Sequence, residues 1–366
     1  MTNQDFILKS YSKNLEKGSI SVQSPSNIAL VKYWGKYGEQ LPKNTSISFT
    51  LSNCHTKTIL EYTPKNSKEY DFKVFLDGER EEGFEPKIKV FFERIEQYVP
   101  FLKDFSFVIK TANSFPHSSG IASSASGMSA LAMCLVELEK RLVSLSTVEG
   151  SKVSTTLDQK RKASFLARLG SGSASRSIEG PLIVWGEHIK IKGSSNLFGT
   201  KYPFLVHDFF KNYQDTILLV DKGEKQVSST VGHGLMHNHP FATQRFEQAN
   251  SNLSKLIPVL ENGDVDTFIA IVESEALSLH AMMLTSMPYF ILMKPNTLSI
   301  INEIWSYRKQ TNSKVCFTLD AGANVHVLYP KNEKETITAF IEEKLSNYCK
   351  NKEYIHDCVG NGAIYL

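Results

Sequence analysis

Apolar residues recur at two different spacings in both halves of the chain, and this mixture constrains the fold more than any other feature. Ile47, Phe49 and Leu51 alternate with polar residues, as in a strand with one buried face. Between residues 128 and 138, apolar side chains fall on one face of a helix instead. Strand-like runs and amphipathic helices continue together to the end of the chain. The sequence therefore predicts an α+β protein, and its 366 residues suggest two domains at about 150 residues each.

The other elements are expected from the same two spacings. Strands are predicted at residues 19–22, 29–33, 46–51, 56–62, 72–76, 105–110, 181–185, 216–220, 314–319, 325–329 and 362–366. Helices are predicted at residues 87–98, 122–138, 241–260, 265–279, 297–309 and 336–348. The periodicity fades between residues 190 and 210, where Gly, Ser, Asn and Pro accumulate. Such a composition is typical of a domain boundary.

Charge and cysteine content exclude several classes of protein. The chain has 41 Lys and Arg against 38 Asp and Glu, a net charge of +3, which argues against a polycationic nucleic-acid binder. Its five cysteines include no CxxC pair, so neither a disulfide framework nor a zinc site is indicated. The N-terminal residues lack the uninterrupted apolar segment of a secretion signal, and no apolar run reaches the length of a membrane span. We therefore expect a cytoplasmic protein.

A loop of small and polar residues, 113–120, directly precedes the helix predicted from Ala122. The first amides of a helix have no partner within the helix, and its dipole presents positive charge there, so such a loop suits a phosphate group. Serine side chains that cap a closely packed helix are the alternative explanation. Neither the P-loop pattern nor GxGxxG occurs in this segment.

Three further segments combine polar side chains with small or apolar neighbours. Residues 170–177 form a second glycine and serine loop, in which Arg176 could bind a carboxylate or phosphate or could lie on a surface turn. Residues 24–36 end in an aromatic pair flanked by two lysines, which could equally be core aromatics beside solvated lysines. Asp320 follows an apolar strand, where it is a half-buried functional carboxylate or a turn residue.

Taken together, these segments resemble the diphosphomevalonate decarboxylase family, part of the GHMP kinase superfamily. Residues 24–36 resemble the opening motif of that family. Segments 42–50, 113–127, 170–177, 226–232, 279–281 and 319–324 resemble its later motifs. The resemblance implies a two-domain GHMP kinase fold: a ribosomal-protein-S5-domain-2-like domain at residues 1–205 and a ferredoxin-like α/β sandwich at residues 206–366.

The resemblance implies an ATP-dependent decarboxylase that uses Mg²⁺. Its substrate would be (R)-mevalonate 5-diphosphate and its product isopentenyl diphosphate, with ADP, phosphate and CO2 released. A homodimer is also implied, with no nucleic-acid or membrane partner. The alternatives are an enzyme acting on mevalonate 5-phosphate, a mevalonate kinase-like enzyme and, from another class, a catalytically silent nucleotide-binding protein.

The same resemblance assigns roles to individual residues. Asp320 would act at the C3 hydroxyl, Arg176 would hold the substrate carboxylate, and Asn27 would position that side of the site. The other expected substrate-binding residues are Tyr33, Trp34, Gly35, Lys36, Arg80, Ser171, Gly172, Ser173, Ala174, Ser175, Ser229 and Thr230. The residues expected to bind the ATP phosphates are Ser118, Ser119, Gly120, Ile121, Ala122, Ser123 and Ser124. The metal ligands are not identified.

Two features depart from the family pattern. Ala323 stands where the family usually has proline, which bears on the rigidity of the loop after Asp320. The segment after Thr230 is unusually rich in histidine, with His233, His237 and His239. Because no carboxylate or cysteine lies in register with these histidines, a metal site is not expected there.

Overall fold

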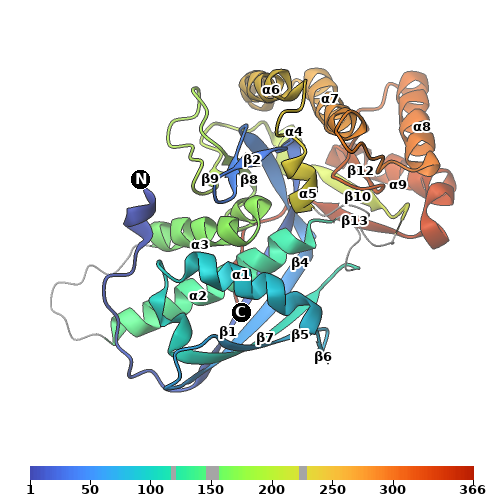
Figure 1. The fold of residues 1–366 in the computed structure, drawn as a ribbon. Helices are drawn as coiled ribbons and strands as arrows, with labels where there is room; N and C mark the ends of the chain where they lie inside the picture. Colours follow the sequence, from blue (N-terminus) through green and yellow to red (C-terminus); the bar gives the residue numbers. More distant parts are fainter. Residues whose placement is uncertain (117–120, 146–155, 222–228) are drawn as a thin grey trace.

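Two long strands, β1 (Gly18–Val31) and β4 (Ser46–Pro64), form the centre of the larger of two main sheets (Figure 1). The computed structural model describes residues 1–116, 121–145, 156–221 and 229–366. The strand order is β14-β1-β4-β7-β5-β6, and β8 and β9 extend the sheet beside the first residues of β4. The other strands of this sheet are β5 (Asp71–Leu76), β6 (Glu79–Arg80), β7 (Phe105–Asn113), β8 (Leu182–Trp185), β9 (Thr200–Lys201) and β14 (Ile364–Tyr365).

Each long strand joins two segments that the sequence predicted as separate strands. In β1 the register with β4 shifts between Pro25 and Asn27, and this bulge accommodates a proline that has no N–H to donate. In β4 the polar residues between the two apolar runs stay extended because the carboxylate of Asp357 accepts the backbone N–H groups of residues 52–54 at 2.7–2.8 Å. These bonds also connect the large sheet to the second half of the chain.

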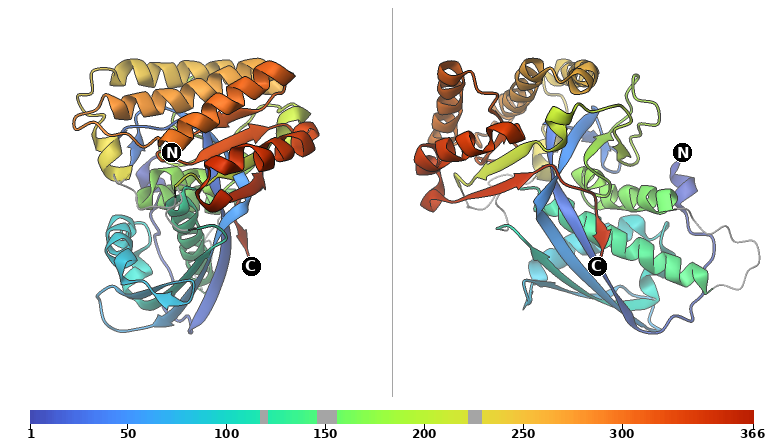
Figure 2. Two further views of the ribbon diagram at one scale, coloured as in Figure 1. Left: turned by 90° about the vertical axis from the view of Figure 1, so that its right-hand side faces the viewer. Right: turned by 180° about the vertical axis from the view of Figure 1, so that it is seen from behind.

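Helices α1 (Glu85–Ile95), α2 (Ser123–Ser144) and α3 (Thr156–Gly170) lie on one side of the large sheet (Figures 1 and 2). Helix α2 packs directly against β1 and β4, and α3 packs against α2 and α1. Helix α3 was not predicted, because residues 163–169 form a nearly continuous apolar run rather than one with helical spacing. Its buried cations have partners: Lys162 lies 2.6 Å from a carboxylate oxygen of Glu139, and Arg168 donates to the carbonyl of Leu197 at 2.8 Å. A buried helix can therefore carry these charges.

The second sheet has the order β11-β12-β10-β13. Its strands are β10 (Gln214–Leu218), β11 (Cys316–Thr318), β12 (Val325–Tyr329) and β13 (Tyr354–Cys358), of which β13 was not predicted. Helices α6 (Ala242–Asn262), α7 (Val265–Leu284), α8 (Pro295–Thr311) and α9 (Lys334–Glu343) accompany it (Figure 2). The helix predicted at 336–348 is α9 followed by a short 3-10 turn, Leu345–Tyr348. Three smaller elements lie among these helices and strands, besides several short 3-10 turns: α4 (Asp208–Lys211), α5 (Ser229–Gly234) and the hairpin β2 (Lys36–Tyr37) with β3 (Leu41–Pro42).

One apolar cluster joins the two halves. Ile28 and Ile47 of the large sheet belong to the same buried cluster as Leu253 of α6 and Phe268 of α7. The final strand, β14, also returns to the large sheet and pairs with β1. The domain boundary at 205/206 stays a prediction. Among the described residues, only α7 is long and apolar enough to cross a membrane, but most of it is buried and it packs against α6 and β11, as a core helix does.

Candidate active site

A cleft lies where the end of β1 meets the second half of the chain. It is lined by residues from β1 and the turn after it, the start of α2, the 170–177 segment, α5, α7 and the loop after β11. The lining residues are Ala29, Lys32, Tyr33, Trp34, Ala122, Ser124, Ser171, Ser173, Arg176, Gly232, His233, Leu279, Phe290, Leu292, Asp320 and Ala321. Segments that are distant in the sequence therefore share one cleft.

Asp320 and Lys32 face each other across this cleft. Nζ of Lys32 lies 3.1 Å from Oδ1 of Asp320, and the two side chains are 2% and 30% exposed. Burial alone would raise the pKa of the Asp320 carboxyl, but the positive charge of Lys32, aided by His326 and Arg176, holds this pKa below its ordinary value. Burial lowers the pKa of Lys32, and the charge of Asp320 opposes that shift. The aspartate is therefore kept as an anion beside a hydrogen-bond donor.

The loop that carries Asp320 is fixed without the proline that the resemblance led us to expect. The carbonyl of Asp320 accepts hydrogen bonds from the backbone N–H of Gly322 at 2.7 Å and from Nε2–H of His280 at 3.1 Å. The carbonyl of Ala323 accepts one from Oγ1 of Thr297 at 2.7 Å. Burial lowers the pKa of His280 to about 4, so its imidazole is neutral and can donate through Nε2.

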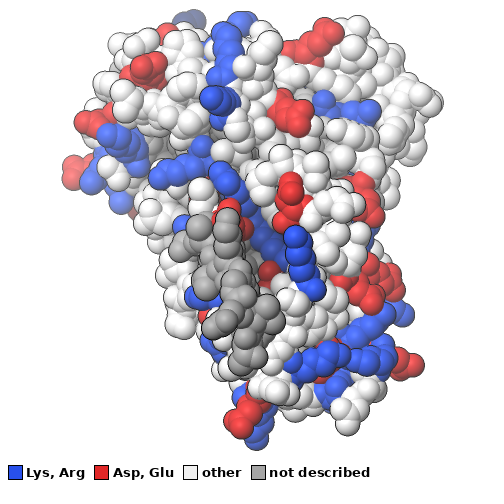
Figure 3. Space-filling view, turned by 90° about the vertical axis from the view of Figure 1, so that its left-hand side faces the viewer, with Lys and Arg blue, Asp and Glu red and all other residues white. Residues whose placement is uncertain are grey.

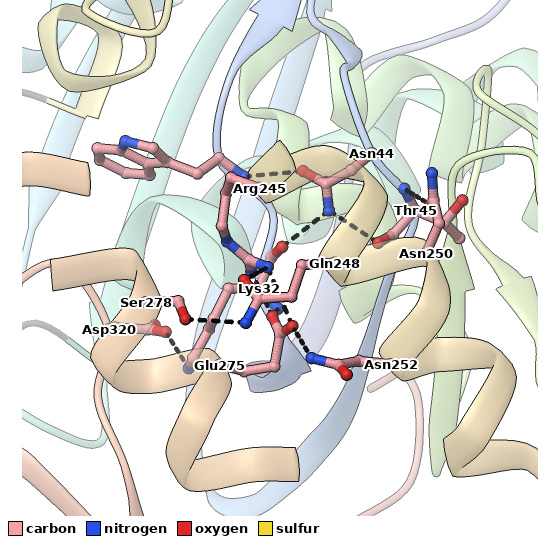
Figure 4. A network of polar contacts seen from close by, with 11 residues as sticks. Lys32, Asn44, Thr45, Arg245, Gln248, Asn250, Asn252, Glu275, Ser278 and Asp320 are labelled. Carbon is pink, nitrogen blue, oxygen red and sulfur yellow. Dashed lines mark hydrogen bonds and ion pairs between the residues drawn. The ribbon is translucent and has the colours of Figure 1, made fainter. Parts of the chain in front are cut away.

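The backbone of Lys32 is held by a buried polar network (Figure 4). The N–H of Lys32 donates to Oε2 of Glu275 at 2.8 Å, and its carbonyl accepts from Nδ2 of Asn44 at 2.9 Å. Glu275, which is fully buried, is also paired with Arg245 and accepts from Nδ2 of Asn252 at 2.7 Å. Helices α6 and α7 thus fix the end of β1 from which the Lys32 side chain extends.

Arg176 enters the cleft from the 3-10 helix Gly172–Ser177. Its Nη1 donates to Oγ of Ser46 at 2.6 Å, its Nε donates to Oδ1 of Asn27 at 3.3 Å, and its guanidinium lies 5.7 Å from the ring centroid of Trp185. Burial lowers the pKa of Arg176 to about 10, which leaves it charged at neutral pH. Asn27 does not line the cleft; it orients Arg176 and also donates to Oγ of Ser177 at 2.8 Å.

Of the other residues predicted in this segment, some line the cleft and others are buried beneath it. Ser171 and Ser173 line the cleft, whereas Gly172, Ala174 and Ser175 are buried and do not line it. A Cβ atom on Gly172 would lie 2.7 Å from the ring of Trp185, so the segment can pass beneath the cleft only with glycine there. The structure thus gives these last three residues a packing role.

Four of the seven predicted ATP-binding residues are described. Ala122 and Ser124 line the cleft, Ser123 begins α2, and Ile121 is buried, with its carbonyl accepting a hydrogen bond from Oγ of Ser26 at 2.6 Å. Ser118, Ser119 and Gly120 lie outside the described residues. The first amides of α2 therefore lie at the edge of the cleft and suit an anion. On one face of the molecule, Lys and Arg side chains also form a band across the middle (Figure 3).

Of the predicted residues 33–36, Tyr33 and Trp34 line the cleft and Gly35 makes the turn after them with φ +93°. Lys36 is half-buried and donates from Nζ to Oε1 of Gln40 at 2.9 Å. Burial, and then the charge of Arg94, lowers its pKa. Lys36 is not among the cleft-lining residues, so it contributes positive charge from behind the turn.

Arg80, another predicted binding residue, is not among the residues that line this cleft. It lies on β6 at the edge of the large sheet, where it pairs with Glu85 at 2.5 Å and Glu82 at 3.9 Å and contacts the ring of Phe75. Its partners are local because β5 and β6 form a tight hairpin. Ser229 and Thr230 open α5, whose later residues Gly232 and His233 line the cleft.

Sequence reasoning missed several residues of the site. Lys32 lies in segment 24–36, which resembles the opening motif of the family, but its pairing with Asp320 depends on the tertiary structure. Glu275 had no visible signal, since it is one of several acidic residues in an apolar helix. His280 lies in segment 279–281, which was recognised, but its hydrogen bond to the carbonyl of Asp320 depends on the tertiary structure. The ring of His233 belongs to the cleft. Within the described ranges, no three His, Cys, Asp or Glu side chains are close enough to hold a metal ion.

Comparison with known proteins shows the same family in both halves of the chain. The model of the diphosphomevalonate decarboxylase-like N-terminal domain matches residues 24–196, and that of the mevalonate 5-diphosphate decarboxylase C-terminal domain matches residues 216–361. The diphosphomevalonate decarboxylase of Saccharomyces cerevisiae is 28% identical over 340 residues, covering 88% of this chain and 80% of the yeast protein.

Solved structures agree with this relationship. The mevalonate diphosphate decarboxylase of Staphylococcus aureus is 27% identical with a TM-score of 0.78, covering 96% of this chain and 98% of that one. A structure described as MDDEF in complex with MVAPP, AMPPCP and magnesium is 27% identical with a TM-score of 0.79, covering 96% of this chain and 99% of that one. The expected two-domain GHMP kinase fold is thereby confirmed. The chain belongs to the diphosphomevalonate decarboxylase family.

Proposed function

We propose that this protein catalyses the ATP-dependent decarboxylation of (R)-mevalonate 5-diphosphate to isopentenyl diphosphate in isoprenoid biosynthesis, releasing ADP, phosphate and CO2. The observation that carries the proposal is that Asp320, paired with Lys32, shares one cleft with Arg176. Relatives with the same fold act on this substrate according to their names, and one was solved with MVAPP, AMPPCP and magnesium. A kinase step and a decarboxylation step can therefore use one bound substrate.

In the first step, Asp320 orients the C3 hydroxyl and takes its proton as the hydroxyl oxygen attacks the γ-phosphorus of ATP, which releases ADP. Lys32 keeps the carboxylate ionised before the proton arrives. Ala122 and Ser124, at the start of α2, line the cleft, and the first amides of this helix would suit the charge of the ATP phosphates. Mg²⁺ bound with the nucleotide offsets the negative charge of its phosphates.

In the second step, the bond between C3 and the phosphorylated oxygen breaks and phosphate leaves. The bond from the carboxylate carbon to C2 then breaks, and its electron pair forms the double bond between C2 and C3. Arg176 holds the carboxylate in line for this loss of CO2, and Ser46 and Asn27 fix the guanidinium plane. Apolar residues Leu279, Phe290 and Leu292 border the same cleft and limit access of water.

The direct test supplies purified protein with ATP, Mg²⁺ and, in separate reactions, mevalonate, its 5-phosphate or its 5-diphosphate. Equal release of ADP and CO2 with the 5-diphosphate alone is expected. Release of both with the 5-phosphate would reassign the substrate, ADP without CO2 would make the protein a kinase, and no reaction in any tube would leave a nucleotide-binding protein.

We also propose that the protein is cytoplasmic and forms a homodimer. The support for the location is that all five cysteines are free thiols, as is typical of a reducing compartment. The support for the homodimer is the family resemblance described above. Cell fractionation tests the location, and light scattering after size-exclusion chromatography tests the oligomeric state, for which a mass near twice 41.1 kDa is expected.

A further inference from the structure

His233 belongs to the second half of the chain, but its ring is held by the first half. The imidazole centroid lies 4.3 Å from that of Tyr33 and 4.5 Å from that of Trp34, and the residue is only 6% exposed. Two glycines permit this approach. A Cβ atom on Gly232 would lie 2.8 Å from the Trp34 ring, and one on Gly35 would lie 2.9 Å from Phe246. The contact is therefore built into both segments.

A hydrogen bond determines which ring nitrogen of His233 carries the proton. The backbone N–H of Gly35 donates to Nδ1 at 2.9 Å, so Nδ1 must present its lone pair. Burial, together with the charges of Lys36 and Arg176, lowers the pKa of His233 to about 3. The imidazole is therefore neutral at neutral pH, with its single proton on Nε2.

Nε2–H has no acceptor within the parts of the chain that the structure describes. The His233 side chain lines the cleft together with Ser171, Arg176 and Trp34. Nε2 is not among the fully buried atoms without a partner, so its N–H can donate to a ligand that enters the cleft. Lys36 and Arg176 both act on the ring electrostatically, so positive charge converges on this part of the cleft. An anionic oxygen is the acceptor that fits.

We propose that His233 is a substrate-binding residue that donates Nε2–H to a phosphate oxygen of the bound substrate. The inference rests on the proposed function. It gives a histidine of the histidine-rich segment a role in binding the substrate rather than a metal ion. The phosphate end is favoured over the carboxylate end because Lys36, whose charge acts on the ring, directly follows Gly35, which holds Nδ1, whereas Arg176 is assigned to the carboxylate. Because the imidazole is neutral, its N–H orients the phosphate oxygen without adding a positive charge to the cleft.

Three variants distinguish the roles of the two ring nitrogens of His233. His233→Asn keeps an acceptor near Nδ1 for Gly35 but has no donor at the Nε2 position, whereas His233→Gln keeps a donor near Nε2. His233→Phe keeps the aromatic contacts and has neither group. We expect KM for the 5-diphosphate to rise about 10-fold or more in the Asn and Phe variants and less than about 3-fold in the Gln variant, with KM for ATP unchanged. Equal KM values for wild type and all three variants would overturn the proposal.

A second measurement remains decisive if the variants fail to fold and does not depend on turnover. In wild-type protein labelled with ¹⁵N-histidine, the His233 signals should report the Nε2–H tautomer, and inorganic diphosphate should shift the Nε2 resonance. No shift at saturating diphosphate, or an equal shift with unphosphorylated mevalonate, would reject the phosphate contact. A shift in a protein that releases no CO2 would support the contact while rejecting the proposed reaction.

Discussion

Nζ of Lys32 lies 3.1 Å from Oδ1 of Asp320, although the two residues are 288 positions apart in the sequence. The lysine comes from the end of the large sheet and the aspartate from the loop after β11. This pair joins the two halves of the protein at the centre of the cleft, and each partner changes the proton affinity of the other.

The Asp320→Asn variant tests the proposed base. The amide retains the shape of the side chain but cannot take the C3 hydroxyl proton, so turnover should fall by about 100-fold or more. Nucleotide binding, measured by fluorescence with an ATP analogue, should stay within about twofold because the start of α2 is unchanged. Near-normal turnover would remove Asp320 from the mechanism.

Replacing Lys32 should change the pH dependence of the reaction. The Lys32→Met variant lacks the positive charge, so the pKa of Asp320 should rise. The aspartate is then protonated at a higher pH, and the acidic limb of the kcat/KM profile moves to higher pH. Lys32→Arg keeps the charge and should leave the limb close to its wild-type position. Profiles measured between pH 4 and 8 decide the matter; superimposable limbs for wild type and Lys32→Met would contradict the coupling.

Arg176→Gln should lower kcat/KM by about 10- to 100-fold, since a hydrogen bond to a charged group is lost. Asn27→Ala serves as the matched variant, because it removes one hydrogen-bond partner of Arg176 and leaves the guanidinium in place. Its loss should be clearly smaller. If steady-state kinetics gave the two variants equal losses, direct binding of the substrate carboxylate by Arg176 would have to be abandoned.

Variants of the Glu275–Arg245 pair can distinguish its effect on stability from its effect on the position of Lys32. Glu275→Gln leaves the buried Arg245 without its counter-charge and should lower the free energy of unfolding by about 3 kcal/mol. The double variant Glu275→Met with Arg245→Met removes both charges and should recover much of that stability in urea unfolding. Its turnover should nevertheless be low, because the methionine side chain gives the N–H of Lys32 no oxygen acceptor, whereas the glutamine amide can still accept it. Full recovery of both quantities would assign the pair a structural role alone.

Acid should destabilise the protein through its buried neutral histidines. The pKa of His280 is about 4 in the folded state against about 6.5 when unfolded, so the unfolded chain binds a proton first as the pH falls. Stability should be complete above about pH 6.5 and decline towards pH 4, with a loss of about 2 kcal/mol from His280 at pH 5. His280→Gln keeps a donor for the Asp320 carbonyl without titrating, and it should show a shallower decline in urea unfolding. An identical decline would exclude His280 as the cause.

Several elements could be predicted from the sequence because their determinants are local. The apolar spacing of α2, α6 and α8 places one face of each helix in the core. The motifs around Asp320 and Arg176 were recognisable for the same reason, since each is a short run of consecutive residues. Helix α3 was missed because residues 163–169 lack helical spacing, and the partners that allow Lys162 and Arg168 to be buried lie on other segments.

The sequence by itself determined the α+β class and the family, and it singled out Asp320 and Arg176 as candidate site residues. The tertiary structure decided which groups meet: it paired Lys32 with Asp320, held Arg80 at a distant hairpin and placed His233 between Tyr33 and Trp34. The physical reason is the distance along the chain over which each interaction acts. Helix and strand spacing act over a few residues, whereas burial, charge pairing and proton affinity depend on neighbours that only the folded chain brings together.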